Sequence, residues 1–67
     1  MKPHQFNQLD EMEQVEAVWS ADKVSQQTSE PGFLIELYRY KGLFLEVKVN
    51  LETRGYVYIK PMLTGWN

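Results

Sequence analysis

The chain contains no cysteine and a single histidine, and these absences remove several kinds of chemistry. Without cysteine there are no disulfides and no thiolate ligands for a structural metal. The one histidine, His4, lies where we expect a frayed end, so no serine or lysine has an evident base beside it for nucleophilic catalysis. We therefore expect no metal and no cofactor, and predict that the protein is not an enzyme.

Positive charge is also scarce, since seven Lys and Arg residues stand against nine Asp and Glu residues. A surface built to neutralise phosphates needs clustered positive charge, so a nucleic-acid partner is not expected. No apolar run approaches the roughly 20 residues that cross a bilayer. The first residues lead into no apolar segment of the kind found in secretory signals, and we therefore expect a cytoplasmic protein.

The length of 67 residues predicts one domain, 1–67, whose stability is limited by its small core. Chains of this size often gain stability from disulfides, metals or partners. Because the first two are not expected, association with another chain is the remaining source. At 43% hydrophobic residues the composition is that of a folded chain and not of a disordered one.

Apolar residues recur at helical spacing in the first third of the chain, which predicts a helix over about 8–20. We expect this stripe to face the core, with Trp19 and Trp66 as anchors; its members are Phe6, Leu9, Met12, Val15 and Trp19. Two residues compete as the N-cap, Asn7 and Asp10. We favour Asp10, which forms a capping box with Glu13, with one looser turn before it.

Alternating apolar and polar residues predict strands over 33–40, 43–50 and 56–60, separated by turn residues. The polar segment 23–29 is an edge strand or an extended loop, and Glu30-Pro31-Gly32 is a turn. The predicted fold class is α+β, with one N-terminal helix packed on a three- to four-stranded antiparallel β-meander.

Side chains alternate across a strand, so odd and even positions separate. The odd set is apolar except for Arg39, and we expect it to form the core under the helix: Phe33, Ile35, Leu37, Leu43, Leu45, Val47, Val49, Val57 and Ile59. The even set combines aromatic and charged residues. One helix covers only one face of this sheet, so the even face is open or covered by another chain.

The register at Lys41-Gly42 bears on this assignment. A two-residue loop would pair Tyr40 with Leu43 and put the two odd sets on opposite faces, so we expect a three-residue loop. Turn chemistry favours a loop over 40–42, whereas cross-strand charge favours a loop over 41–43, and both remain open. At the next hairpin a five-residue loop, 51–55, pairs Lys48 with Tyr58 and Glu46 with Lys60.

The even face suggests a function, because aromatic residues among a few balanced charges are typical of protein interfaces. We predict a non-enzymatic interaction or adaptor protein that forms a homodimer or binds another protein there. The candidate residues are Tyr38, Tyr40, Phe44, Tyr56, Tyr58, Glu36, Glu46 and Lys48. The structural alternative is an ordinary half-exposed sheet face, where tyrosine is common.

Two further hypotheses use other features. The acidic helix residues Asp10, Glu11, Glu13 and Glu16 suggest an inhibitor or modulator of a larger host or phage machine, acting on a basic partner. Their structural alternative is a solvated helix start whose charges favour the helix dipole. The third hypothesis is a small-ligand-binding module with its site formed between subunits.

Two stretches carry a resemblance to known proteins: FNQLDEMEQVEAVW, residues 6–19, and LIELYRYKGLFLEVKV, residues 34–49. In this helix-then-hairpin pattern the chain resembles small uncharacterised bacterial proteins encoded in mobile elements and gene cassettes. The resemblance covers about half of the chain. It implies a stand-alone accessory or adaptor protein, and it carries no active-site residues over.

Overall fold

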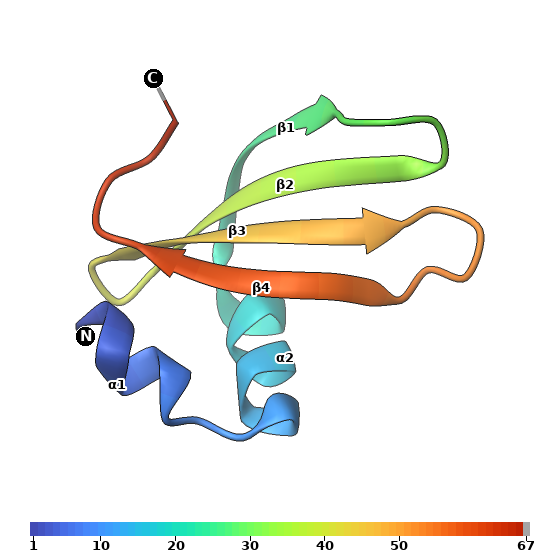
Figure 1. Cartoon of the computed structure of the whole chain (residues 1–67). Coiled ribbons are helices and arrows are strands. Elements are labelled where there is room, and N and C mark those ends of the chain that lie inside the picture. Colours follow the sequence, from blue (N-terminus) through green and yellow to red (C-terminus); the bar gives the residue numbers. More distant parts are fainter. Residues whose placement is uncertain (67) are drawn as a thin grey trace.

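Two short helices precede a four-stranded sheet in the computed structural model, which describes residues 1–66 (Figure 1). The helices are α1 (Pro3–Asn7) and α2 (Glu11–Ser20). The strands are β1 (Asp22–Thr28), β2 (Phe33–Tyr40), β3 (Leu43–Asn50) and β4 (Tyr56–Met62). All neighbouring strands are antiparallel and follow the order β1-β2-β3-β4. The predicted α+β class with a β-meander is therefore confirmed.

The segment predicted as 23–29 forms β1, an edge strand whose seven residues are all exposed. The segments predicted over 33–40 and 43–50 coincide with β2 and β3, whereas β4 continues two residues beyond 60. Pro61 is accepted there because β4 is the other edge of the sheet, where a missing N–H donor is tolerated. Within residues 1–66, no helix has the length and apolar character that crossing a membrane requires.

The start of α2 follows the predicted capping box. The Asp10 carboxylate accepts a hydrogen bond from the Glu13 backbone N–H at 2.8 Å, and the Glu13 carboxylate accepts one from the Asp10 N–H at 3.1 Å. The looser turn expected before Asp10 is a separate helix, α1. The Gln14 side-chain amide joins the two helices by donating to the Phe6 and Leu9 carbonyl oxygens.

The three-residue loop expected at Gly42 is wrong. Tyr40 pairs directly with Leu43, so Lys41 and Gly42 alone form the turn. Their φ angles are 47° and 80°, as a type I′ turn requires, and this turn matches the right-handed twist of the two strands. Glycine at the second position adopts the left-handed conformation without steric cost.

This register also corrects the odd-numbered core. The helix side of the sheet, defined here as the face on which α2 packs, takes odd residues from β3 but even residues from β2, such as Tyr38 opposite Leu45. Phe33, Ile35 and Leu37 lie on the other face, which we call the open side. The error arose because β2 is apolar on both faces, so either parity places apolar residues on the helix side.

The second hairpin agrees with the prediction. Lys48 pairs with Tyr58, and Glu46 pairs with Lys60. Beyond Lys48 the register shifts, because Val49 pairs with Tyr56 and Val57 is the extra residue of a bulge. Val57 is consequently exposed instead of joining the core.

The helix stripe predicted to face the core is wrong in two of its members. The core consists of Phe6, Ala17, Val18, Leu43, Leu45 and Val47, with Leu9 among the partly buried residues packed against it. Met12 and Trp19 are 61% and 68% exposed. Ala17 and Val18 face the sheet instead, because their small side chains let the α2 backbone approach it closely.

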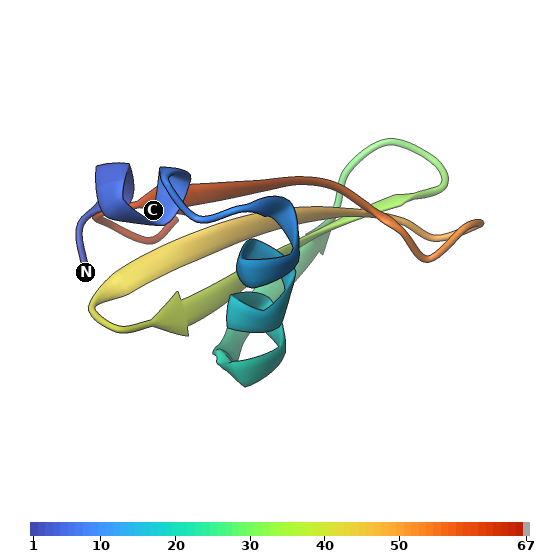
Figure 2. The same cartoon turned by 90° about the horizontal axis from the view of Figure 1, so that it is seen from below.

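The helices cover only part of the helix side. Viewed from below, α1 lies at the end where β2 turns into β3, and α2 crosses beside it (Figure 2). The opposite end, towards the β1–β2 and β3–β4 loops, has no helix over it (Figures 1 and 2). Leu34 and Val49 pair across the strands at this end and are only partly buried.

Candidate functional site

The eight aromatic and charged residues predicted to share one face are divided between both faces of the sheet. The two-residue turn places Glu36, Tyr38 and Tyr40 on the helix side, and Tyr56 joins them through its pairing with Val49. The remaining four lie on the open side, namely Phe44, Glu46, Lys48 and Tyr58. The continuous aromatic face predicted from the sequence therefore does not exist.

On the helix side, Glu36 binds two neighbouring side chains. The Tyr38 hydroxyl donates to Glu36 Oε1 at 3.0 Å, and Lys23 Nζ lies 2.7 Å from Glu36 Oε2. Burial of Tyr38, together with its hydrogen bond to Glu36, raises the pKa of the phenol to about 12. Both carboxylate oxygens of Glu36 are thus engaged in structural contacts.

On the open side, Glu46 has a similar role. It accepts hydrogen bonds from the Tyr58 hydroxyl at 2.6 Å and from Trp66 Nε1 at 3.0 Å. The hydrogen bond from Tyr58, joined by that from Trp66 and the charge of Lys60, holds the pKa of Glu46 below its usual value. The same hydrogen bond raises the pKa of Tyr58 to about 12.

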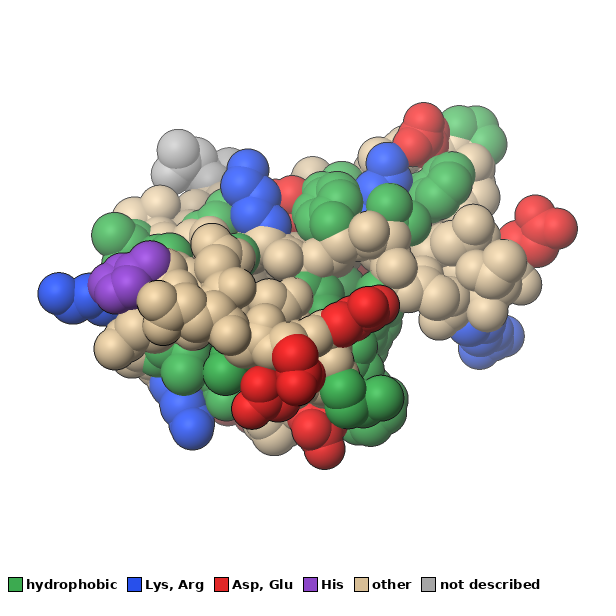
Figure 3. Space-filling view, turned by 60° about the horizontal axis from the view of Figure 1, so that its bottom comes forward, with side chains coloured by type: hydrophobic (Ala, Val, Ile, Leu, Met, Phe, Trp, Pro, Cys, Tyr) green, Lys and Arg blue, Asp and Glu red, His purple; other side chains and the backbone are tan. Residues whose placement is uncertain are grey.

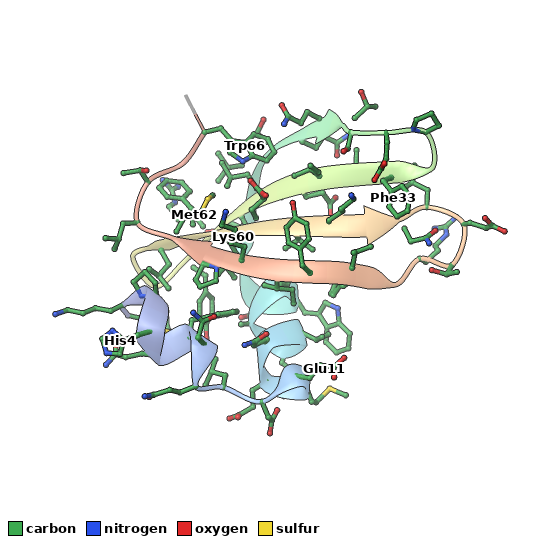
Figure 4. All side chains as sticks on the ribbon, in the orientation of Figure 1. His4, Glu11, Phe33, Lys60, Met62 and Trp66 are labelled. Carbon is green, nitrogen blue, oxygen red and sulfur yellow. The ribbon has the colours of Figure 1, made fainter. Side chains whose placement is uncertain are left out.

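The segment after β4 covers one end of the open side. Gly65 packs so closely that a Cβ atom there would lie 3.4 Å from both Leu37 and Phe44. Leu37 is only 4% exposed although no helix lies over it. Trp66 and Met62 lie towards one end of the sheet in Figure 4, and Phe33 lies at the other, where Lys48 Nζ sits 4.8 Å from its ring centroid. The segment after β4 therefore covers the open side at the end where Leu37 and Phe44 lie.

The hydrogen bonds to Glu46 predict a pH dependence of stability. A carboxyl whose pKa is lowered on folding stabilises the fold above its ordinary pKa of about 4.5, and this contribution is lost as the pH falls through the lowered value. We expect the unfolding free energy of wild type to fall more steeply below pH 4.5 than that of Glu46→Gln. Urea unfolding over a pH series measures the unfolding free energy of both proteins. If the two free energies fall in parallel below pH 4.5, the hydrogen bonds to Glu46 do not lower its pKa.

The acidic residues at the start of α2 serve different purposes. Asp10 and Glu13 form the capping box, whereas Glu11 and Glu16 are exposed and have no such partner within the described chain. His4 is exposed on α1, and Figure 4 shows it well apart from Glu11. Among residues 1–66, no group of three His, Asp or Glu side chains is placed to hold a metal ion.

Two of the three most exposed large apolar side chains, Trp19 and Met12, lie on α2. Met12 and Trp19 are seven residues apart, about two helical turns, and Val15 lies between them on the same side of the helix. We call these three residues the ridge. An exposed Trp is uncommon and is over-represented at binding hot spots, so the ridge is the first candidate for contact with another chain.

A hollow lies beside the ridge. Val15 and Glu11 of α2 form one wall of a cavity of about 220 Å³, and Tyr56 and Val57 of β4 lie across from them. A second hollow of about 440 Å³ adjoins it across the Val49–Tyr56 pair; its lining is Leu34, Glu36, Val49, Leu51 and Arg54. We call the two together the groove. Figure 3 shows acidic and apolar side chains gathered over α2 and the hollowed surface next to them.

Sequence reasoning missed this site because it assigned the large side chains of α2 to the core. One signal was available: Gln14, Ala17 and Val18 form a second stripe at helical spacing, and the small Ala17 and Val18 suit close packing. The groove itself depends on how far α2 extends over the sheet, which the local pattern does not specify.

Comparisons with protein-family models, with curated proteins and with solved structures found no match for this chain.

Proposed function

We propose that this protein is a non-enzymatic interaction module that binds another protein chain through the ridge and the groove beside it. The observation that supports this is the exposure of Trp19 and Met12 on a helix whose other side is well packed. Leaving large apolar side chains in water gains the fold nothing, whereas burying them in a partner is favourable by about 1.5–3 kcal/mol each.

The contacts of the two partly buried carboxylates, Glu36 and Glu46, support a role without catalysis. Both oxygens of Glu36 and both oxygens of Glu46 already take part in structural contacts, so neither carboxylate is a free base, although Glu36 lines the groove. The proposed setting is the cytoplasm, with which a chain free of cysteine is compatible. An accessory role in mobile elements stays a prediction from the resemblance.

The ridge variant Met12→Ser/Trp19→Ser tests the proposal. We expect wild type, immobilised as bait, to retain a defined protein from a lysate of the cells that encode it, and the ridge variant to lose it. Removing a Trp hot spot costs at least about 2 kcal/mol, or about 30-fold in affinity.

The matched control is Val24→Ser/Leu63→Ser, which changes two exposed apolar residues that lie outside α2. It should retain the same protein as wild type. If wild type, ridge variant and control retain it equally, the ridge is not the binding surface.

A further inference from the structure

Most of the outer edge of β1 lacks the features that usually keep an edge strand from pairing. All seven residues of β1 are exposed, and from Val24 to Ser29 the chain has no charged residue and no proline. Lys23, the only basic residue of the strand, forms an ion pair with Glu36 on β2, and the bulge lies between Lys23 and Ser25. From Ser25 onwards β1 is therefore a regular, uncharged edge to which a further strand can add.

The opposite edge of the sheet is better protected. β4 contains the bulge at Val57 and has Lys60 and Pro61 towards its C-terminal end. A bulge twists an edge out of register, an exposed charge disfavours burial, and a proline removes a backbone donor. Figure 1 also shows α1 beside the C-terminal end of β4, which it contacts. Pairing through a sheet edge is therefore expected at β1.

The register shows which backbone groups of β1 point outwards. The Ser29 N–H donates to the Phe33 carbonyl oxygen, so the odd-numbered residues of β2 direct their backbone groups towards β1. Gln27 lies opposite one of these residues and directs its own groups towards β2. Because the directions alternate along an antiparallel strand, Gln26 and Thr28 direct their N–H and C=O groups away from the sheet. An added strand would form its ladder hydrogen bonds with these two residues.

A second copy of β1 matches these outward groups. Two identical strands related by a two-fold axis through Gln27 are antiparallel, and Gln26 of each copy then lies opposite Thr28 of the other. Each of these pairs exchanges both of its N–H···O=C hydrogen bonds, because both residues direct their groups outwards. Gln27 lies opposite Gln27 of the second copy at the axis.

The side chains along this edge suit the same pairing. Residues 25–29 are Ser, Gln, Gln, Thr and Ser, and each of these side chains offers a hydrogen-bond donor and an acceptor. Identical strands therefore match each other, and no like charges oppose each other along the paired segment. An apolar strand of another protein would find no apolar side chain on residues 25–29. The chemistry of the edge thus favours a second copy.

We infer that the chain forms a homodimer through β1, in which two four-stranded sheets become one continuous sheet. The residues involved lie outside the ridge and the groove, so this inference goes beyond the proposed function. A contact along one strand edge is small, and small interfaces are weak, so we expect a dissociation constant on the order of 0.1 mM. Monomers and dimers should therefore exchange as the protein is diluted.

Charge changes at Gln27 test the two-fold axis. In Gln27→Lys two Lys side chains oppose each other across the axis, and in Gln27→Glu two Glu side chains do, so each variant alone should dimerise about fivefold more weakly than wild type. An equimolar mixture brings Lys opposite Glu and should restore the average molar mass of wild type. Sedimentation equilibrium over a dilution series measures the molar mass, which is 7.9 kDa for the monomer.

Two further sets of variants complete the test. Gln8→Lys and Gln8→Glu are the matched controls, because Gln8 is exposed at the end of α1, and both should dimerise as wild type does. Gln26→Pro removes a backbone N–H that points away from β2, a place where an edge strand accepts proline. This variant should keep the circular dichroism of the folded chain and stay monomeric.

The outcomes separate the inference from the proposed function. A wild type that stays at 7.9 kDa up to about 1 mM overturns the inference, and so does a dimer that both Gln27 variants retain. If only the ridge variant Met12→Ser/Trp19→Ser abolishes the dimer, the second copy binds at the ridge, and the inference fails while the proposed function stands. If wild type is monomeric and Gln26→Pro loses a protein that wild type captures from the lysate, β1 binds a strand of another protein, which also overturns the inference.

Discussion

Phe6→Ala should lower the free energy of unfolding by about 3–5 kcal/mol. Phe6 is fully buried, and its ring lies edge-on to Tyr40 with 6.3 Å between the ring centroids. α1 has five residues and is far too short to be stable alone, so this side chain anchors it to the sheet. A domain of this size has about 3–10 kcal/mol of stability in total, and the variant should therefore be largely unfolded.

Urea unfolding followed by circular dichroism measures this loss. Phe33→Ala is the matched control, because Phe33 is only partly buried at the far end of the open side, and it should cost markedly less. A loss below about 1 kcal/mol for Phe6→Ala would mean that α1 is not docked on the sheet.

Leu45→Ala should cost about 2–5 kcal/mol, because Leu45 is fully buried in the middle of β3 and its removal leaves a cavity under α2. Leu51→Ala removes the same atoms from a side chain that is 50% exposed, and should change stability by less than about 0.5 kcal/mol. Similar losses for the two variants would contradict the placement of the core.

A double-mutant cycle extends this prediction to the register. Leu45→Val, a milder change, should couple with Tyr38→Ala by about 0.5 kcal/mol or more, because the two residues oppose each other on the helix side. Coupling of Leu45 with Leu37, which lies on the open side, should be weaker. If the odd-numbered residues formed the core, as expected from the sequence, Leu45 would couple more strongly with Leu37 than with Tyr38.

The strands could be predicted from the sequence because their alternating patterns end at residues that favour turns. Phe33 to Tyr40 and Leu43 to Asn50 are bounded by Gly32, by Lys41-Gly42 and by the polar residues after Asn50. Their register could not be derived from the assumed parity, because β2 presents Leu34 and Tyr38 on one face and Ile35 and Leu37 on the other. The twist of the hairpin then favours the two-residue turn.

The candidate site was the less predictable part. Asp10 with Glu13 predicted where α2 begins, because a capping box is a local interaction. Which side of α2 meets the sheet depends on packing, and there the small Ala17 and Val18 outweigh the larger Met12 and Trp19. The hydrogen bond from Trp66 to Glu46 joins residues 20 positions apart, and no local pattern indicates it.

The measurement that tests the account most directly is the unfolding free energy of Met12→Ser/Trp19→Ser against wild type. If the ridge is a binding surface and contributes nothing to the core, the two values should agree within about 0.5 kcal/mol, as for most surface substitutions. A loss of about 3 kcal/mol or more would place these side chains in the core, as the sequence pattern suggested, and would contradict the account.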